Sequence, residues 1–436
     1  MSESQETMTM MNFTRRGFVK LTGGLTALGL VSVPSLSAFA SAKKRVVVVG
    51  GGYGGSVAAK YIRMADPNIQ VTLIEKNKDY YSGPLSNWVV AGFRKLEVQK
   101  WGYEGLKKHG IEVVIDEVTA VDPAGKSVTT AGGKKFEYDR LIMSPGIGFK
   151  ALEGYDAEAM KKMPHAWIAG EQTTLLTKQL QELKDGDPFV MVAPPDPYRC
   201  PPGPYERASL VAHYLKKNKP KSKVIILDPK DKFSKMGLFT QGWKNLYGYE
   251  TDKSLIEWVP GAQGGKVTRV DAKTMTVYTD MAEFKSSCIN VIPPNKAGDI
   301  AEKAGLADEK GFCPINFETF ESTKQKNIHV IGDASAATGL PKSGYAANSE
   351  AKVCAAAVVA LLNGKPVGVP SYVNTCYSLI SPDYGISVAG VYKLHAGKIL
   401  EVSGGVSSDK AQDFIRKQEA LYNESWYQSI MADTFG

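Results

Sequence analysis

The sequence has few cysteines and histidines, and their spacing excludes several kinds of site. It contains five of each among 436 residues. No two cysteines are spaced as C-x-x-C, which argues against a zinc or iron–sulfur framework. No C-x-x-C-H motif is present either, so the chain has no attachment site for a c-type haem of its own. The histidines do not cluster, and we expect no metal site.

The chain also lacks basic stripes and, beyond its N-terminus, long hydrophobic runs. Its net charge is +8, but its lysines and arginines form no stripe with interleaved aromatic residues, which argues against nucleic-acid binding. No stretch beyond the first 40 residues has the pattern of a membrane span, so we expect no stable membrane insertion. The chain does have length and a 43% hydrophobic content, enough for two or three domains with their own cores.

The N-terminus carries an export pattern. Arg15 and Arg16 precede a short apolar run at residues 21–33, and small residues at 38–40 follow at the usual spacing for cleavage. This pattern is typical of a twin-arginine signal peptide. A short buried helix or a retained anchor is the alternative, but the run is too short and too rich in glycine, serine and threonine to span a bilayer. We expect residues 1–40 to direct export to the periplasm.

Two segments of the chain share the order strand, turn, helix, strand. In the first, consecutive valines at 46–49 predict a buried strand that leads through a glycine-rich turn into a helix from Ser56. In the second, strands over 189–193 and 223–228 flank a helix from Glu206. The pattern predicts an α/β protein with two Rossmann-like dinucleotide-binding domains. The predicted division is 43–160 and 286–365 for the first domain, 161–285 for the second, and 366–436 for a mixed α+β interface domain.

The first glycine-rich turn has the spacing of a dinucleotide-binding motif. Gly50, Gly52 and Gly55 form G-x-G-x-x-G between a strand and a helix. The first glycine allows the tight turn, the second lets the backbone approach a pyrophosphate, and the third lets helix and strand pack closely. Glu75, at the end of the next strand, is placed to accept hydrogen bonds from a ribose. A glycine-rich loop without a ligand is the weaker alternative.

A second motif, further along the chain, favours a flavin nucleotide. Residues 328–334 have the pattern of a buried strand that ends in Gly332 and Asp333. This segment resembles the second FAD motif of two-dinucleotide-fold flavoproteins, such as the glutathione reductase group. The resemblance implies that Asp333 hydrogen-bonds the ribityl chain of FAD, whereas the alternative is an acid that only caps a strand. We therefore predict FAD at the first motif.

The second Rossmann-like segment has prolines where a nicotinamide nucleotide needs glycines. Residues 193–204 contain six prolines. Proline has no N–H to offer a phosphate, and it cannot adopt a positive φ. We expect the fold to be kept and NAD(P) binding to be lost. The flavin would then receive its electrons from another donor.

Four strings of residues are long enough to point to one family. They are 199–208 (RCPPGPYERA), 341–345 (PKSGY), 374–378 (NTCYS) and 433–436 (DTFG). In these strings the chain resembles the flavoprotein subunit of flavocytochrome c sulfide dehydrogenase, a relative of sulfide:quinone reductase. The resemblance covers essentially the whole mature chain.

The resemblance implies a redox-active disulfide between Cys200 and Cys376, placed over the flavin. Hydrosulfide would attack one sulfur, form a persulfide and release a thiolate that donates an electron pair. From the residues alone, a structural disulfide or two buried thiols would be the more ordinary interpretation. Glu206 could shuttle a proton, or it could be an acid favoured in the first turn of a helix. The other three cysteines are expected to be core residues: Cys288, Cys313 and Cys354.

The resemblance also implies a partner. Because the chain has no haem motif, its electrons would pass to a separate c-type cytochrome subunit. A sulfide:quinone reductase would share the fold and the cysteines, but it usually has an apolar C-terminal face for the membrane, and residues 409–436 are largely polar. A non-catalytic docking subunit is a third alternative.

The sequence departs from the family at Gly83. Family members commonly have Tyr-Tyr-x-Cys there, and that cysteine bonds to the 8α-methyl group of the flavin. Here the string is Tyr80-Tyr81-Ser82-Gly83, and no nearby cysteine can substitute. We therefore predict non-covalent FAD.

Overall fold

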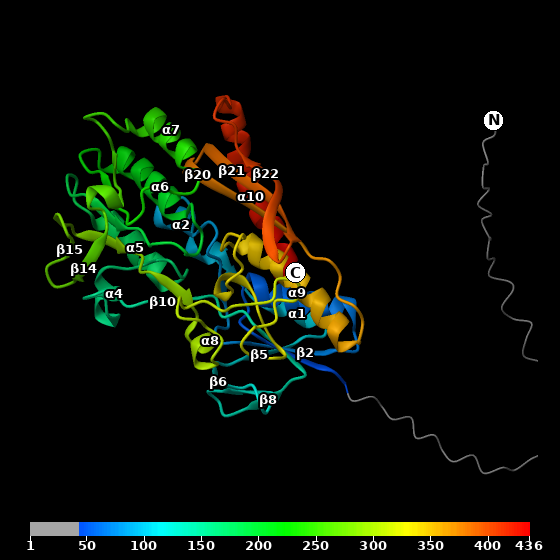
Figure 1. The fold of residues 1–436 in the computed structure, drawn as a ribbon. Helices are drawn as coiled ribbons and strands as arrows, with labels where there is room; N and C mark the ends of the chain where they lie inside the picture. The colour runs from blue at the N-terminus through cyan, green and yellow to red at the C-terminus, as the bar shows by residue number, and fades with distance from the viewer. Residues whose placement is uncertain (1–42) are drawn as a thin grey trace, which may run out of the picture. The chain divides into compact units, whose positions relative to one another are not determined.

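Five parallel strands form the sheet that carries the Gly50 turn (Figure 1). The structure is a computed structural model that describes residues 43–436, so the predicted export signal at 1–40 lies outside the described residues. The strand order is β19-β9-β1-β2-β5, as in a doubly wound dinucleotide-binding sheet. The strands are β1 (Arg45–Val49), β2 (Gln70–Glu75), β5 (Glu112–Ile115), β9 (Arg140–Met143) and β19 (Ile328–Val330).

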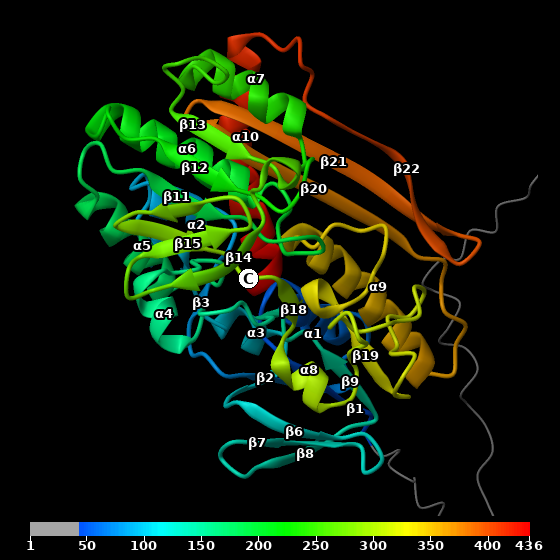
Figure 2. The ribbon, with the colours of Figure 1, turned by 60° about the vertical axis from the view of Figure 1, so that its left-hand side comes forward.

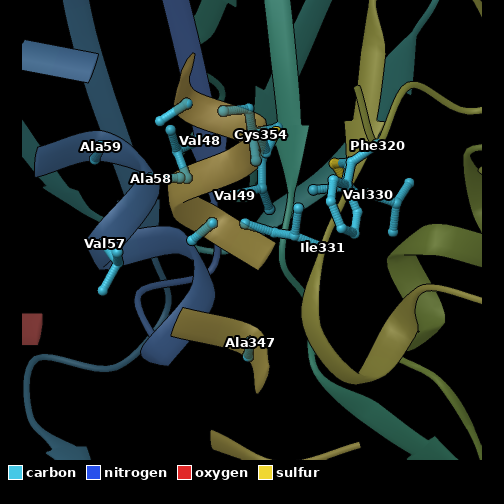
Figure 3. Packing of buried hydrophobic residues seen from close by; sticks show 14 of the residues in the cluster. Val48, Val49, Val57, Ala58, Ala59, Phe320, Val330, Ile331, Ala347 and Cys354 are labelled. Carbon is cyan, nitrogen blue, oxygen red and sulfur yellow. The ribbon is translucent and has the colours of Figure 1, made fainter. Parts of the chain in front are cut away.

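Two helices pack on this sheet and against each other (Figure 3). α1 (Tyr53–Ala65) follows the glycine turn directly, and α9 (Gly344–Leu362) packs against it. Val57, Ala58 and Cys354 are fully buried in the core that the helices share with the strands. By length and mean hydropathy (1.2), α9 could cross a membrane, but half of its apolar window is buried in the fold. Its apolar composition is that of a core helix.

Four further parallel strands form a second sheet in the order β13-β12-β11-β17. They are β11 (Phe189–Val192), β12 (Val224–Leu227), β13 (Ile256–Val259) and β17 (Cys288–Val291). β11 and β12 are buried along their whole length, and α6 (Gly203–Asn218) connects them. The second sheet confirms the predicted repeat of the Rossmann-like plan.

Short antiparallel strands form small sheets of their own beside the two parallel sheets (Figure 2). β10 (Ile147–Phe149) and β18 (Asn295–Ala297) pair as an antiparallel ribbon. β10 follows β9 of the first parallel sheet, and β18 follows β17 of the second. A three-stranded antiparallel meander is also inserted in the chain of each parallel sheet, between β5 and β9 in the first and between β13 and β17 in the second. These are β6 (Val118–Asp122), β7 (Ser127–Thr130) and β8 (Lys135–Glu137), and β14 (Val267–Asp271), β15 (Thr276–Thr279) and β16 (Glu283–Lys285).

The C-terminal residues, for which the sequence predicts a mixed α+β domain, form a long antiparallel sheet and a long helix. The elements are β20 (Ser371–Ser381), β21 (Tyr384–His395), β22 (Lys398–Val406) and α10 (Asp413–Phe435). α10 packs on β20 and β21, and Phe435 near its end contacts the rings of Tyr80 and Trp101. Serine and glycine interrupt the alternation of apolar residues in these strands, so the pattern reveals only fragments of them.

Both Rossmann helices begin three residues before their predicted starts. α1 begins at Tyr53 where Ser56 was predicted, and α6 begins at Gly203 where Glu206 was predicted. The first turns of these helices contain glycine or proline. Such residues are tolerated there because the first N–H groups of a helix have no intrahelical partner.

We expect Gly55→Ala to disrupt the packing of α1 on the glycine turn. A Cβ at residue 55 would lie 1.8 Å from the Gly50 carbonyl oxygen, so helix and turn would have to separate. The loss in free energy of unfolding should exceed about 2 kcal/mol. Urea unfolding followed by circular dichroism measures it.

Gly237, in α7 (Met236–Tyr247), provides the control, because a Cβ there meets nothing within 4 Å. Gly237→Ala should raise the free energy of unfolding by about 0.5–1 kcal/mol, the usual gain from alanine in a helix. Equal unfolding midpoints for wild type and Gly55→Ala would contradict the packing role of Gly55.

Candidate functional site

A single cleft collects nearly all of the residues that the sequence singles out. It runs from the glycine turn, past residue 333, to the loop before α6 and to β20. The predicted site residues that line it are Gly50, Gly52, Glu75, Cys200, Glu206, Asp333 and Cys376. Gly55 is the exception, because it packs behind the turn against the Gly50 carbonyl. The structure thus brings the predicted flavin residues and the predicted sulfur residues into one cleft.

The glycine turn leaves the N-terminus of α1 at the cleft. Gly50 has a φ of +97°, and a Cβ there would lie 2.2 Å from the Ser144 carbonyl oxygen, so only glycine fits. Gly52 precedes α1, and no side chain within residues 43–436 caps the first turn of this helix. Its first N–H groups are therefore suited to an anionic pyrophosphate. Glu75 Oε2 accepts a hydrogen bond from Gly51 N at 2.7 Å, which holds the carboxylate beside the turn.

Asp333 is held by a residue to which the sequence assigns no role. Arg199 Nε donates to Asp333 Oδ2 at 2.6 Å, and both side chains are mostly buried. The other oxygen, Oδ1, is buried and has no hydrogen-bond partner within residues 43–436. Buried carboxylate oxygens are normally hydrogen-bonded, and a ligand hydroxyl would satisfy this one. Lys342 Nζ also donates to the Asp333 carbonyl at 2.9 Å and fixes the backbone.

Three further residues of the cleft carry buried donors without a partner in the described part of the chain. They are Trp167 Nε1, Asn423 Nδ2 and Trp426 Nε1. Such donors suit the carbonyl oxygens of a flavin ring. None of the three follows from the sequence, because an isolated tryptophan or asparagine belongs to no recognisable spacing. Together with the open helix end and Asp333, these residues fit FAD.

Cys200 lies in the proline-rich loop, with its backbone fixed on both sides. Its φ of +57° is in the left-handed region, which is uncommon for residues other than glycine. Its N–H donates to the Lys342 carbonyl at 2.7 Å, and its carbonyl accepts from Gly203 N at 2.8 Å. A Cβ on Gly203 would lie 3.0 Å from Cys200 Sγ, so the thiol sits against the first turn of α6.

Cys376 lies on β20 and lines the same cleft. Both Cys200 and Cys376 are free thiols in the structure, so the disulfide between them stays a prediction. Burial raises the pKa of both thiols. A thiolate at either position therefore needs a stabilising positive charge. The remaining cysteines are fully buried: Cys288, Cys313 and Cys354.

Glu206 bridges two elements of the site. Its Oε1 accepts a hydrogen bond from Leu379 N at 2.8 Å, and its Oε2 accepts one from Asn87 Nδ2 at 2.8 Å. Burial raises the pKa of this carboxyl. The carboxyl therefore has a structural role between α6 and β20 and also a perturbed affinity for protons at the cleft wall.

The second sheet has its own counterpart of Glu75, and other side chains occupy it. Asp228 directly follows β12 and is completely buried. Tyr205 Oη donates to its carboxylate at 2.6 Å, Lys230 Nζ at 2.7 Å and Trp258 Nε1 at 3.1 Å. A ribose would have to displace these donors. This arrangement and the prolines of the preceding loop argue against a nicotinamide nucleotide on the second sheet.

Gly83 also lines the cleft. A Cβ at this position would meet nothing within 4 Å, so there is room for a side chain, but glycine supplies no nucleophile. The position is therefore open toward the ligand without being able to bond to it.

Three protein-family models match parts of the chain. Residues 173–293 match "Sulfide dehydrogenase (flavocytochrome c) flavoprotein chain, central", and residues 368–435 match "Flavocytochrome c sulphide dehydrogenase, flavin-binding". Residues 44–180 match "Pyridine nucleotide-disulphide oxidoreductase". The first match contains Cys200 and Glu206, and the second contains Cys376.

A sulfide dehydrogenase chain and sulfide–quinone reductases are also similar to this chain in sequence or in fold. It is 56% identical over 46 residues to the sulfide dehydrogenase (flavocytochrome c) flavoprotein chain of Chlorobaculum thiosulfatiphilum, which covers 96% of that sequence and 11% of this one. It is 26% identical over 348 residues to a sulfide-quinone reductase of Aquifex aeolicus, with 74% of this chain and 78% of that one covered. The X-ray structure of the sulfide:quinone oxidoreductase from Aquifex aeolicus has the same fold, with a TM-score of 0.69, 22% identity, and coverage of 90% of this chain and 92% of that one.

We expect Arg199→Met to weaken FAD binding. The substitution leaves the Asp333 carboxylate mostly buried without its 2.6 Å partner. A hydrogen bond to a charged group contributes about 1.5–3 kcal/mol, so the dissociation constant should rise at least about tenfold. Fluorescence titration of the apoprotein with FAD measures the change. Arg269→Met is the control, because Arg269 is exposed and stacks on Tyr278 away from the cleft. Equal FAD affinity in wild type and Arg199→Met would show that Arg199 does not hold Asp333 for the ligand.

Proposed function

The chain belongs to the family of flavocytochrome c sulfide dehydrogenase flavoprotein chains, and we propose that it oxidises sulfide and passes the electrons through FAD to a separate c-type cytochrome. The observation that carries this proposal is the meeting of Cys200, Cys376 and Glu206 in the cleft whose other end fits a dinucleotide. A flavin that receives electrons from sulfide needs the cysteine pair and the dinucleotide-binding residues in the same cleft.

The cysteine pair supplies the chemistry for sulfide. With Cys200 and Cys376 joined as a disulfide, hydrosulfide attacks one sulfur and forms a new S–S bond to it. The bond between the cysteines breaks, and the other cysteine leaves as a thiolate with the electron pair of that bond. Bound FAD would supply an acceptor that takes two electrons and releases them singly, as a one-electron haem requires.

Glu206 is the proton-transfer group of this proposal. It lines the cleft with the two cysteines, and burial raises its pKa, which brings its proton affinity closer to neutral pH. It would accept the proton that hydrogen sulfide loses when it becomes hydrosulfide. The hydrogen bonds from Asn87 and from Leu379 N keep the carboxyl in place.

Quinone is the second candidate acceptor, and the C-terminal surface favours it more than the sequence suggests. Residues 409–436 are largely polar, yet Phe414 and Leu421 on α10 are exposed, as are Val402 and Val406 on β22. Exposed apolar residues that form one continuous patch mark a surface that meets a membrane or another protein. Relatives named above are sulfide–quinone reductases. Cytochrome remains our first choice because the family matches at 173–293 and 368–435 are both to flavocytochrome c sulfide dehydrogenase.

Two further parts of the proposal rest on the sequence. The twin-arginine motif at residues 15–16 supports export to the periplasm, where a c-type cytochrome would be available. Gly83 supports FAD that is held by contacts alone, because the position that would carry a covalent bond has no nucleophile.

Sulfide should bleach the flavin of the wild-type protein under anaerobic conditions. Cys200→Ser and Cys376→Ser should keep bound FAD and lose this bleaching, because serine can neither form a persulfide nor leave as a thiolate. Dithionite should still reduce the flavin of both variants. Adding oxidised cytochrome c to the bleached wild-type protein should restore the flavin absorbance. Anaerobic absorbance titration records each step.

Cys354→Ala is the matched control, because Cys354 is buried in the core of α9 and does not line the cleft. It should bleach at the wild-type rate. Reoxidation by a quinone analogue but not by cytochrome c would reject the cytochrome and favour the second candidate. A wild-type flavin that sulfide does not bleach would reject sulfide oxidation and favour the non-catalytic docking subunit.

Acid precipitation should separate the flavin from the protein. Because Gly83 has no side chain to bond to the flavin, we expect the yellow colour to remain in the supernatant after trichloroacetic acid treatment. Colour that stays with the precipitate would mean that a covalent bond forms elsewhere, and mass spectrometry of flavin-containing peptides would locate it.

A further inference from the structure

Lys235 places a positive charge beside the cysteine pair, and neither the motifs nor the proposed chemistry uses it. The residue immediately precedes α7, and its carbonyl accepts hydrogen bonds from Leu238 N and Phe239 N, both at 3.0 Å. Its φ of +59° is uncommon for a lysine, so its surroundings must hold the backbone in this conformation. The side chain reaches across to another element, where Nζ donates to Ser378 Oγ at 2.9 Å.

Ser378 fixes where the Lys235 ammonium lies relative to Cys376. Both residues are on β20, two positions apart, and alternate residues of a strand point to the same face. β20 pairs regularly with β21 at both positions, and the register shifts only after Leu379. Two residues along a strand span roughly 7 Å. An ammonium bound at Ser378 therefore lies on the face of β20 that also carries the Cys376 thiol.

The ionisable groups that act on Lys235 are thiols and carboxyls. Burial lowers the pKa of Lys235, and Cys376, Glu206, Cys200 and Glu419 all raise it. At Cys376 the effects have the opposite sign, because burial raises the pKa of the thiol and Lys235 lowers it, while Glu206 raises it further. These directions agree with the position that the Ser378 hydrogen bond gives the ammonium, because a cation there favours the anionic form of the Cys376 thiol.

We propose that Lys235 is a positioning residue that holds anionic sulfur at Cys376. It attracts hydrosulfide in preference to neutral hydrogen sulfide, and it stabilises the anion that this cysteine carries as a thiolate or a persulfide. In the exchange described above, the negative charge of hydrosulfide passes to the departing thiolate. One cation beside the cysteines can therefore stabilise the charge before and after the exchange. The inference rests on the proposed sulfide oxidation and names its substrate class as small anionic sulfur nucleophiles.

The thiolate at Cys376 can be measured without sulfide. The FAD-loaded protein is reduced with a phosphine, freed of reductant, and treated anaerobically with iodoacetamide, which is neutral and reacts with thiolates. Peptide mass spectrometry then gives the alkylation rate of Cys376 at each pH. In Lys235→Met the midpoint of this profile should rise by about one pH unit, and the rate near pH 7 should fall about tenfold, because the variant lacks the neighbouring cation.

Two more variants make the result specific. Lys235→Arg keeps the charge and should restore the profile toward that of wild type. Lys232→Met is the matched control, because Lys232 is an exposed lysine of the same loop, and its profile should equal that of wild type. If Lys235→Met does not fold, Ser378→Ala, which keeps the ammonium but removes its anchor, should shift the midpoint in the same direction by a smaller amount.

A Cys376 profile that does not move in Lys235→Met overturns the inference, and so does an unmoved profile in Ser378→Ala where only that variant folds. The assay contains no sulfide, so its outcome is separate from that of the proposed function. A wild-type protein that sulfide fails to reduce would reject the function while the alkylation profiles still decided the position of the charge.

Discussion

The hydrogen bond from Leu379 N to Glu206 ties the C-terminal sheet to the first turn of α6. Cys376 lies on β20 just before Leu379, and Cys200 lies in the loop that leads into α6. The two cysteines belong to distant parts of the chain, and this junction is one of the contacts that bring them into one cleft. Because the Glu206 carboxyl is buried, it needs both of its donors. The group proposed to move a proton therefore also helps to join the two elements that carry the cysteines.

Buried charge organises the rest of the molecule in the same way. Arg199 neutralises the charge of Asp333 where the ligand would lie, and the uncapped N-terminus of α1 is suited to bind an anionic phosphate. On the second sheet, Asp228 is satisfied by Tyr205, Lys230 and Trp258. The two sheets share a topology, but one keeps its polar groups available to a ligand and the other satisfies them internally. This difference supports the proposal that donor electrons arrive by a route other than a nicotinamide.

The sequence predicts those parts of the fold and site that a local motif specifies. Gly50, Gly52, Gly55 and Glu75 lie within one strand–helix–strand unit, where geometry imposes their spacing. Asp333 and Cys376 required a resemblance, because their roles depend on elements far away in the chain. Arg199, Asn423 and Trp426 follow from neither source, since tertiary packing alone brings them to the cleft. The same holds for Lys235, which packing brings to Ser378 on β20. The lengths of the C-terminal strands do not follow from the sequence for a related reason. Their serines and glycines interrupt the alternation of apolar and polar residues that marks a strand.

We propose that the flavin receives its electrons from the cysteine pair and not from a nicotinamide nucleotide. Rapid anaerobic mixing of the oxidised flavoprotein with sulfide, and separately with NADH at the same concentration, tests it most directly. We predict that sulfide bleaches the flavin absorbance at a rate that saturates with concentration, while NADH leaves the absorbance unchanged. Bleaching by NADH at a comparable rate would show that a nicotinamide nucleotide can supply the electrons.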